Sequence, residues 1–218
     1  MRRPLAEFLG SFALVLAGTG AIVVNDASHG VVSHVGVSLV FGLVVMAMID
    51  TLGDISGAHL NPAVTLGFTL ARRFPLRDVP AYIGSQIAGA LAASATLRLL
   101  FPAHPTLGAT LPAGSASQSF ILEAILTALL MLTILRVSTG AKERGIVAAI
   151  TIGGVIALEA LFAGPISGAS MNPARSLAPA LLSGRVDSLW IYLAAPPLGA
   201  AVAVALNHAL REPAPSPA

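Results

Sequence analysis

Long runs of apolar residues, each about as long as a membrane is thick, dominate the chain. A helix needs about 20 residues, at about 1.5 Å per residue, to cross a hydrocarbon core about 30 Å thick. The pattern therefore predicts an all-α membrane protein with six transmembrane helices. The six runs lie at about 5–24, 33–52, 80–101, 118–136, 145–163 and 189–209.

Two shorter apolar segments, about 61–71 and 172–182, each begin with Asn-Pro-Ala: Asn61, Pro62 and Ala63, and Asn172, Pro173 and Ala174. Asn is a strong N-cap, and Pro fits the first helical position because the N–H it lacks would be unpaired there. Each segment is long enough to cross only about half a bilayer. We predict two half-helices that begin inside the membrane and line a cavity.

The two triplets belong to two copies of one stretch, SGAHLNPAV and SGASMNPAR, about half a chain length apart. Each half of the chain holds three long spans and one half-helix, and an odd number of spans inverts the second copy. The half-helices are therefore expected to enter from opposite faces and to meet near the midplane. The predicted boundaries are 1–104 and 115–210 for the two repeats, 1–218 for a single transmembrane channel domain, and 212–218 for a Pro-rich, disordered tail.

The composition supports a membrane protein and argues against several classes of function. Hydrophobic residues make up 56% of the chain and charged residues 10%, whereas a soluble domain has about 25% charged residues. The chain has no cysteine, hence no disulfide framework and no thiolate metal site. We find no nucleophile–base pair, phosphate loop or metal-ligand spacing, so we expect no catalytic residue, metal or cofactor. The basic residues sit at the ends of apolar runs, which argues against a nucleic-acid partner.

These basic residues also predict the orientation. With the N-terminus inside, the outer loops, about 25–32, 102–117 and 183–188, hold only Arg185. The positive-inside rule then predicts that both termini lie in the cytoplasm. We expect a multi-pass protein of the plasma (cell inner) membrane. Nine of the 12 Lys and Arg residues fall on the inner side: Arg2, Arg3, Arg72, Arg73, Arg77, Arg136, Lys142, Arg144 and Arg211.

The half-helix starts suggest a pore for neutral polar solutes. Each N-terminus carries roughly half a positive charge, so two that meet at the midplane oppose cations and a proton-conducting water chain. The asparagine amides add donors. The stretches before them are expected to be extended, with backbone carbonyls lining the pore because they cannot face lipid unpaired. These stretches are Gly57, Ala58, His59 and Leu60, and Gly168, Ala169, Ser170 and Met171.

Two charged residues lie within the apolar segments near the second triplet. Arg175 follows it, where the first copy has Val64. A charge at the membrane centre costs at least about 2.5 kcal/mol, so Arg175 should face water or a partner. It is either a fixed cation at a constriction or one half of a salt bridge to a buried Glu. For Glu159 two interpretations stay open: it lines the pore or pairs with Arg175, or it faces a neighbouring helix or a subunit interface.

With these motifs the chain resembles the major intrinsic proteins, the aquaporin family. The stretch 163–177, AGPISGASMNPARSL, is similar to the plant nodulin-intrinsic branch and its bacterial relatives. The resemblance implies a homotetramer with one pore in each protomer. It also implies that Glu7 and Glu123, matched in the first span of each half, brace the pore loops.

The same resemblance implies a selectivity filter formed by Phe41, Ala160, Ala169 and Arg175. Water-strict members carry His where this chain has Ala160, so a wider and less polar filter is expected. Glycerol facilitators usually carry Asp at the position of Ser176, which argues against a dedicated glycerol channel. Members commonly carry His where this chain has Asp54, so the cytoplasmic vestibule departs from the family pattern.

The sequence thus predicts a passive channel for water and small uncharged solutes that excludes ions and protons. Candidate solutes are small polyols, urea, ammonia and undissociated metalloid acids. Two alternatives remain. A coupled secondary transporter also uses inverted repeats and broken helices, and Glu159 is the feature that favours it. A nonconducting junction protein would pass no solute at all.

Overall fold

The computed structural model describes residues 1–138 and 146–210, without the side chain of Ile146. Within these residues the chain is helical, with no strand. The six long helices agree with the predicted spans, and each is long and apolar enough to cross a membrane. The elements are α1 (Arg2–Ala27), α2 (Ser33–Ser56), α3 (Pro62–Leu70), the 3-10 turn η1 (Leu76–Asp78), α4 (Val79–Leu100), α5 (Ala116–Val137), α6 (Ile146–Ser167), α7 (Pro173–Ser183) and α8 (Leu189–Ala209).

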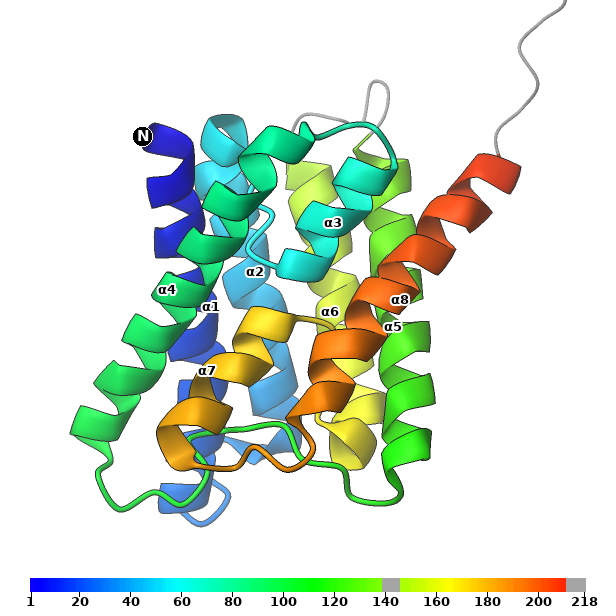
Figure 1. Ribbon diagram of the computed structural model, residues 1–218. Coiled ribbons are helices and arrows are strands. Elements are labelled where there is room, and N and C mark those ends of the chain that lie inside the picture. Colours follow the sequence, from blue (N-terminus) through cyan, green and yellow to red (C-terminus); the bar gives the residue numbers. More distant parts are fainter. Residues whose placement is uncertain (139–145, 211–218) are drawn as a thin grey trace, which may run out of the picture.

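The long helices surround the two short ones (Figure 1). Helices α3 and α7 enter from opposite faces, and their N-terminal ends approach each other at mid-height. The order of three long helices and one short helix occurs twice along the chain. Helix α1 begins and α8 ends at the same face of the molecule. The predicted tail 212–218 and three basic residues of the inner side, Lys142, Arg144 and Arg211, lie outside the described residues.

Close helix crossings occur at glycines, in matching places of the two halves. A Cβ at Gly89 on α4 would overlap the carbonyl of Phe8 on α1, and a Cβ at Gly199 on α8 would overlap the carbonyl of Ala124 on α5. Membrane helices have little hydrophobic force between them, so small residues that let backbones approach are the usual basis of such packing. The two halves therefore pack internally in the same way.

Helices α2 and α6 join the two halves along a similar contact. A Cβ at Gly42 would lie 2.5 Å from the carbonyl oxygen of Gly153, and a Cβ at Gly153 would lie 2.6 Å from the carbonyl oxygen of Gly42. Large apolar side chains are exposed on the outer faces of the long helices, as expected for surfaces that meet lipid chains. They include Leu39, Leu43, Ile121, Ile125 and Leu129.

Candidate functional site

The two asparagines cap the half-helices with their side-chain oxygens. Asn61 Oδ1 accepts from the N–H of Ala63 at 2.8 Å. Asn172 Oδ1 accepts from the N–H of Ala174 at 3.0 Å and of Arg175 at 3.3 Å. Both asparagine backbones are extended, and a proline follows each at the first helical position. This geometry directs each amide nitrogen away from its own helix.

Each amide nitrogen instead binds the other copy. Asn61 Nδ2 donates to the carbonyl of Met171 at 2.8 Å, and Asn172 Nδ2 donates to the carbonyl of Leu60 at 2.9 Å. The two half-helix starts are therefore tied together by a reciprocal pair of hydrogen bonds. One lone pair of each of these two carbonyls is used within the protein. One hydrogen on each amide nitrogen has no acceptor in the described contacts and can donate to a solute.

The stretches before the asparagines are not extended, contrary to the expectation. In the first copy Gly57, Ala58 and Leu60 have φ values of 86°, 45° and 52°. In the second copy the φ values of Gly168, Ala169 and Met171 are 86°, 42° and 54°. Such left-handed residues between ordinary ones point successive N–H groups to one side, which forms a concave anion site. The physical reason for the departure is that a buried carboxylate fills this concavity in each half.

In the first half this carboxylate belongs to Glu7 on α1, which is fully buried. Its oxygens accept from the N–H of His59 at 2.9 Å and of Leu60 at 2.7 Å. They also accept from Ser56 Oγ at 2.7 Å and from Gln86 Nε2 at 2.8 Å. Four donors therefore surround one carboxylate, which satisfies a buried charge and fixes the loop.

In the second half Glu123 on α5 takes the same place and is also fully buried. It accepts from the N–H groups of Ser170 and Met171, each at 2.8 Å. Ser167 Oγ donates to it at 2.8 Å. No amide side chain completes this set in the described part of the chain. In the described residues Glu123 therefore has three hydrogen-bond donors where Glu7 has four.

A tyrosine on the last long helix of each half holds the end of the preceding helix. Tyr82 donates to the carbonyl of Ser56 at 2.8 Å, and Tyr192 donates to the carbonyl of Ser167 at 2.7 Å. These contacts and Gln86 were not singled out from the sequence. The signal was present, because Tyr82 and Tyr192 occupy matching places in the two repeats and Gln86 is a lone amide within an apolar run.

Arg175 is buried, with 2% of its surface exposed, and lines an internal cavity. Its NH1 group donates to the carbonyl of Gly108 at 2.8 Å, and its Cζ lies 5.0 Å from the centre of the Phe41 ring. No carboxylate of residues 1–138 or 146–210 forms an ion pair with it. The salt-bridge interpretation of Arg175 is therefore not supported by the described contacts. Gly108 comes from the loop between α4 and α5, which the sequence reasoning did not connect with this residue.

Two cavities within the molecule share part of their lining. The larger has a volume of about 970 Å³ and reaches from exposed Asp50 and Asp54 to the asparagines. The smaller has a volume of about 290 Å³ and lies beside the loop that holds Gly108. Three residues line both cavities, and they are Phe41, Ala160 and Arg175. The junction of the two cavities therefore falls at three of the four predicted filter residues.

Ala169, the fourth predicted filter residue, lines the larger cavity. Glu159 lines neither cavity, and its side chain is 2% exposed. Neither of its carboxylate oxygens has a hydrogen-bond partner among the described residues. Of the two interpretations of Glu159, the geometry supports the one in which it faces a neighbouring helix.

His59 packs among aromatic rings of the larger cavity. Its ring stacks on Phe68 with centroids 4.7 Å apart and lies 4.9 Å from the Phe74 ring. Its Nδ1 lies 3.1 Å from Thr65 Oγ1. The matching Ser170 is part of a chain of hydroxyls that also includes Ser176 and Thr110. Across residues 1–138 and 146–210 no group of His, Asp and Glu side chains is arranged to hold a metal.

Residues 1–207 match the family described as Major intrinsic protein. The chain belongs to this family. Aquaporin NIP1-1 of Oryza sativa subsp. japonica is 48% identical over 201 residues, which cover 92% of this chain and 71% of that protein. Nodulin-26 of Glycine max is 44% identical over 201 residues, which cover 92% of this chain and 74% of that protein. The predicted similarity to the nodulin-intrinsic branch is confirmed.

The fold is that of the aquaporins. An X-ray structure of the aquaglyceroporin from Plasmodium falciparum has a TM-score of 0.86 and 28% sequence identity, covering 96% of each chain. The predicted all-α class with six spans and two half-helices is confirmed. Members of this family are membrane channels rather than enzymes, and this chain is a channel protein of the same kind.

Proposed function

We propose that each protomer is a passive pore for water and for at least one larger uncharged solute, with its filter at Phe41, Ala160, Ala169 and Arg175. The observation that carries this proposal is that Phe41, Ala160 and Arg175 line both cavities. Two of the four filter residues carry only a methyl group. Such a wall leaves room beside Phe41 and Arg175 for a solute wider than water. It also has few hydrogen-bonding groups, so water gains little over a small polyol in hydrogen bonding.

Charge exclusion in this proposal has two sources. The N-termini of α3 and α7 meet where Asn61 and Asn172 bind each other's loop. Each contributes roughly half a positive charge at that point. Arg175 adds a whole charge one turn further along the route. A cation would meet both barriers without its hydration shell, whereas a neutral solute can accept from the asparagine amides and from Arg175.

The candidate solutes beyond water are small polyols, urea, ammonia and undissociated metalloid acids. The names of the relatives support this class, since one solved relative is called an aquaglyceroporin. Ser176 stands where glycerol facilitators usually carry Asp. The hydroxyl of Ser176 is hydrogen-bonded to the hydroxyls of Thr110 and Ser170, so in the described contacts it does not donate into the cavity. A dedicated glycerol channel is therefore not the form that we propose.

The coupled-transporter alternative loses its main support. Transporters hold coupling ions with acidic groups on the transport route. Glu159 was the candidate for such a group, and it lines neither cavity. The described residues also contain no acidic cluster suited to a cation.

The test uses the purified protein reconstituted in lipid vesicles, with stopped-flow light scattering for water, glycerol and urea. We expect water flux well above that of empty vesicles, together with glycerol or urea flux that rises linearly with the gradient. Saturable flux that depends on an ion gradient would indicate the transporter. Flux equal to that of empty vesicles for every solute would indicate the nonconducting protein.

We also propose that the functional unit is a homotetramer in the plasma (cell inner) membrane, with both termini in the cytoplasm. Apolar side chains on the outer helix faces and the cluster of basic residues at one face support these proposals. Native mass spectrometry in detergent tests the first. For the second, a cysteine at exposed Ser115 should react with an impermeant reagent outside intact cells, and one at Ser138 should not.

A further inference from the structure

The loop between α4 and α5 carries the carbonyl that holds Arg175, and its shape is unusual. Leu107 has a φ of 52° and is fully buried, and Gly108 has a φ of 73°. A Cβ at Gly108 would lie 2.9 Å from Thr19 Cβ, so the loop lies directly against α1. A left-handed conformation costs a non-glycine residue about 1–3 kcal/mol, and it persists only where the surroundings enforce it.

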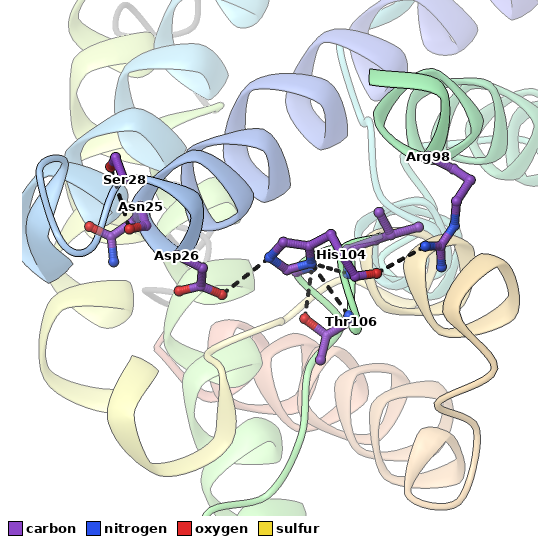
Figure 2. A network of polar contacts seen from close by, with 8 residues as sticks. Asn25, Asp26, Ser28, Arg98, His104 and Thr106 are labelled. Carbon is purple, nitrogen blue, oxygen red and sulfur yellow. Dashed lines mark hydrogen bonds and ion pairs between the residues drawn. The ribbon is translucent and has the colours of Figure 1, made fainter. Parts of the chain in front are cut away.

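His104 is the side chain that enforces this turn. Its Nδ1 accepts from the N–H of Leu107 at 3.0 Å and from the N–H of Thr106 at 3.4 Å. The side chain is 8% exposed, and its Nε2 faces Asp26 Oδ2 at 3.4 Å (Figure 2). An atom that accepts from two N–H groups carries no proton, so the hydrogen of the neutral imidazole is on Nε2, toward Asp26.

Arg98 fastens the remainder of the same loop. Its guanidinium donates to the carbonyls of Pro102 at 3.0 Å and His104 at 2.9 Å, and to Leu182 at the end of α7 at 3.0 Å. Figure 2 shows Arg98 and Asp26 on opposite sides of His104. These two are the charged groups that face His104 in the described residues. Arg98 binds its backbone, and Asp26 lies opposite its ring nitrogen Nε2 without forming a hydrogen bond to it.

We propose that neutral His104 is a positioning residue for selectivity, because it holds the Gly108 carbonyl on Arg175, and that external acid releases this hold. The inference rests on the proposed function, in which Arg175 is part of the filter. A proton on Nδ1 turns the acceptor into a donor that faces two other donors. The turn at Leu107 then relaxes, and Arg175 NH1 loses the partner that keeps it against the wall.

A guanidinium without this partner turns its donors toward the lumen, where water and solute are the available acceptors. It then narrows the constriction, and a larger solute is affected more than water. We therefore expect the ratio of glycerol to water permeability to fall. One net hydrogen bond corresponds to about a three- to tenfold change in such an equilibrium.

Two substitutions of similar polarity separate this role from simple packing. Asn places its Oδ1 where His has Nδ1, two bonds from Cβ, whereas Gln places its amide one bond further out. His104→Asn should keep the wild-type ratio at pH 7.5. His104→Gln should lower it about three- to tenfold. His29→Asn is the matched control, since His29 is exposed on the same face and Asn tolerates its φ of 54°.

The experiment measures the ratio of glycerol to water permeability for vesicles at an external pH of about 7.5 and of about 5. The ratio of the wild type and of His29→Asn should fall in acid, and that of His104→Asn should not. The proposal would be overturned if the permeability ratio of the wild type were the same at both pH values. It would also be overturned if His104→Asn and His104→Gln had equal permeability ratios.

A second readout does not depend on transport. The amide of Leu107 should be protected from hydrogen exchange in the wild type and in His104→Asn at pH 7.5, and should exchange at least about threefold faster in His104→Gln. If the wild type passes no solute, the proposed function fails, yet this exchange pattern still decides whether His104 holds the loop. Equal protection in both variants would contradict the role of His104 whatever the transport result.

Discussion

The two re-entrant segments use the same parts for support and different parts where solutes pass. In each, a buried carboxylate binds two backbone N–H groups and a serine, an asparagine caps the half-helix, and a tyrosine holds the preceding helix. The first segment adds Gln86 and an aromatic group around His59. The second adds Arg175 and a chain of hydroxyls. The repeated contacts therefore form the scaffold, and the unrepeated ones are where selectivity should reside.

The largest expected effect comes from the two bracing carboxylates. A Gln at either position keeps one acceptor oxygen and places an NH₂ against backbone donors. With the NH₂ in the place of Oε2, the conflict involves Leu60 N–H and Gln86 Nε2 at position 7, and only Met171 N–H at position 123. Each unsatisfied buried donor costs about 1–3 kcal/mol.

Glu7→Gln should therefore lower the thermal unfolding temperature in detergent more than Glu123→Gln does. We expect both variants to be less stable than the wild type. The double variant Glu7→Gln, Gln86→Leu removes one of the two donors in conflict, so it should regain part of the loss. If Glu123→Gln lowers the unfolding temperature more than Glu7→Gln does, the number of donors in conflict does not explain the stability of the two loops.

The next effect concerns ions and compares Arg175 with Val64, its counterpart in the first segment. Arg175→Ala should keep or raise neutral-solute flux and admit proton or cation leak, because one of the two positive barriers is removed. Val64→Ala is the control and should leave ion leak unchanged. A pH-sensitive dye inside vesicles under a pH gradient measures the leak. If ion leak in Arg175→Ala stays at the background level, the barrier to ions lies wholly with the half-helices and Arg175 does not contribute to it.

A smaller effect is expected at Glu159, which lies as far before Asn172 as Met48 lies before Asn61. Glu159→Met makes the second half like the first at this position. An unpaired buried carboxyl is costly, so its removal should raise the unfolding temperature by a few degrees, about 2–4 °C per kcal/mol. Solute flux should stay within about twofold, because the side chain lines neither cavity. A changed selectivity would contradict this placement.

The sequence was sufficient to predict those elements whose structure depends only on nearby residues. Hydrophobic length predicted the six spans, and Asn-Pro-Ala predicted where α3 and α7 begin. These signals act within one segment, and no distant contact overrides them. The matched positions of Glu7 and Glu123 supported the duplication, whereas their bracing role was expected from the resemblance to the aquaporin family.

The sequence was insufficient where one segment depends on another. Ala58, Leu60, Ala169 and Met171 have left-handed backbones that their residue types disfavour, and only the distant carboxylates explain this. The reciprocal asparagine bonds join the two halves, so neither half alone predicts them. The Gly108 carbonyl comes from a loop without periodicity. Its position depends on His104, Arg98 and the surface of α1.

The central claim is that Ala160 and not Glu159 sets the width of the filter. The decisive measurement is stopped-flow water and glycerol permeability of Ala160→His in vesicles, beside the wild type and Glu159→Met. Histidine fills the gap between Phe41 and Arg175, so glycerol flux should fall about tenfold or more while water flux falls much less. Glu159→Met should leave both unchanged. Equal loss of both fluxes in Ala160→His would contradict the account, and so would no loss together with altered selectivity in Glu159→Met.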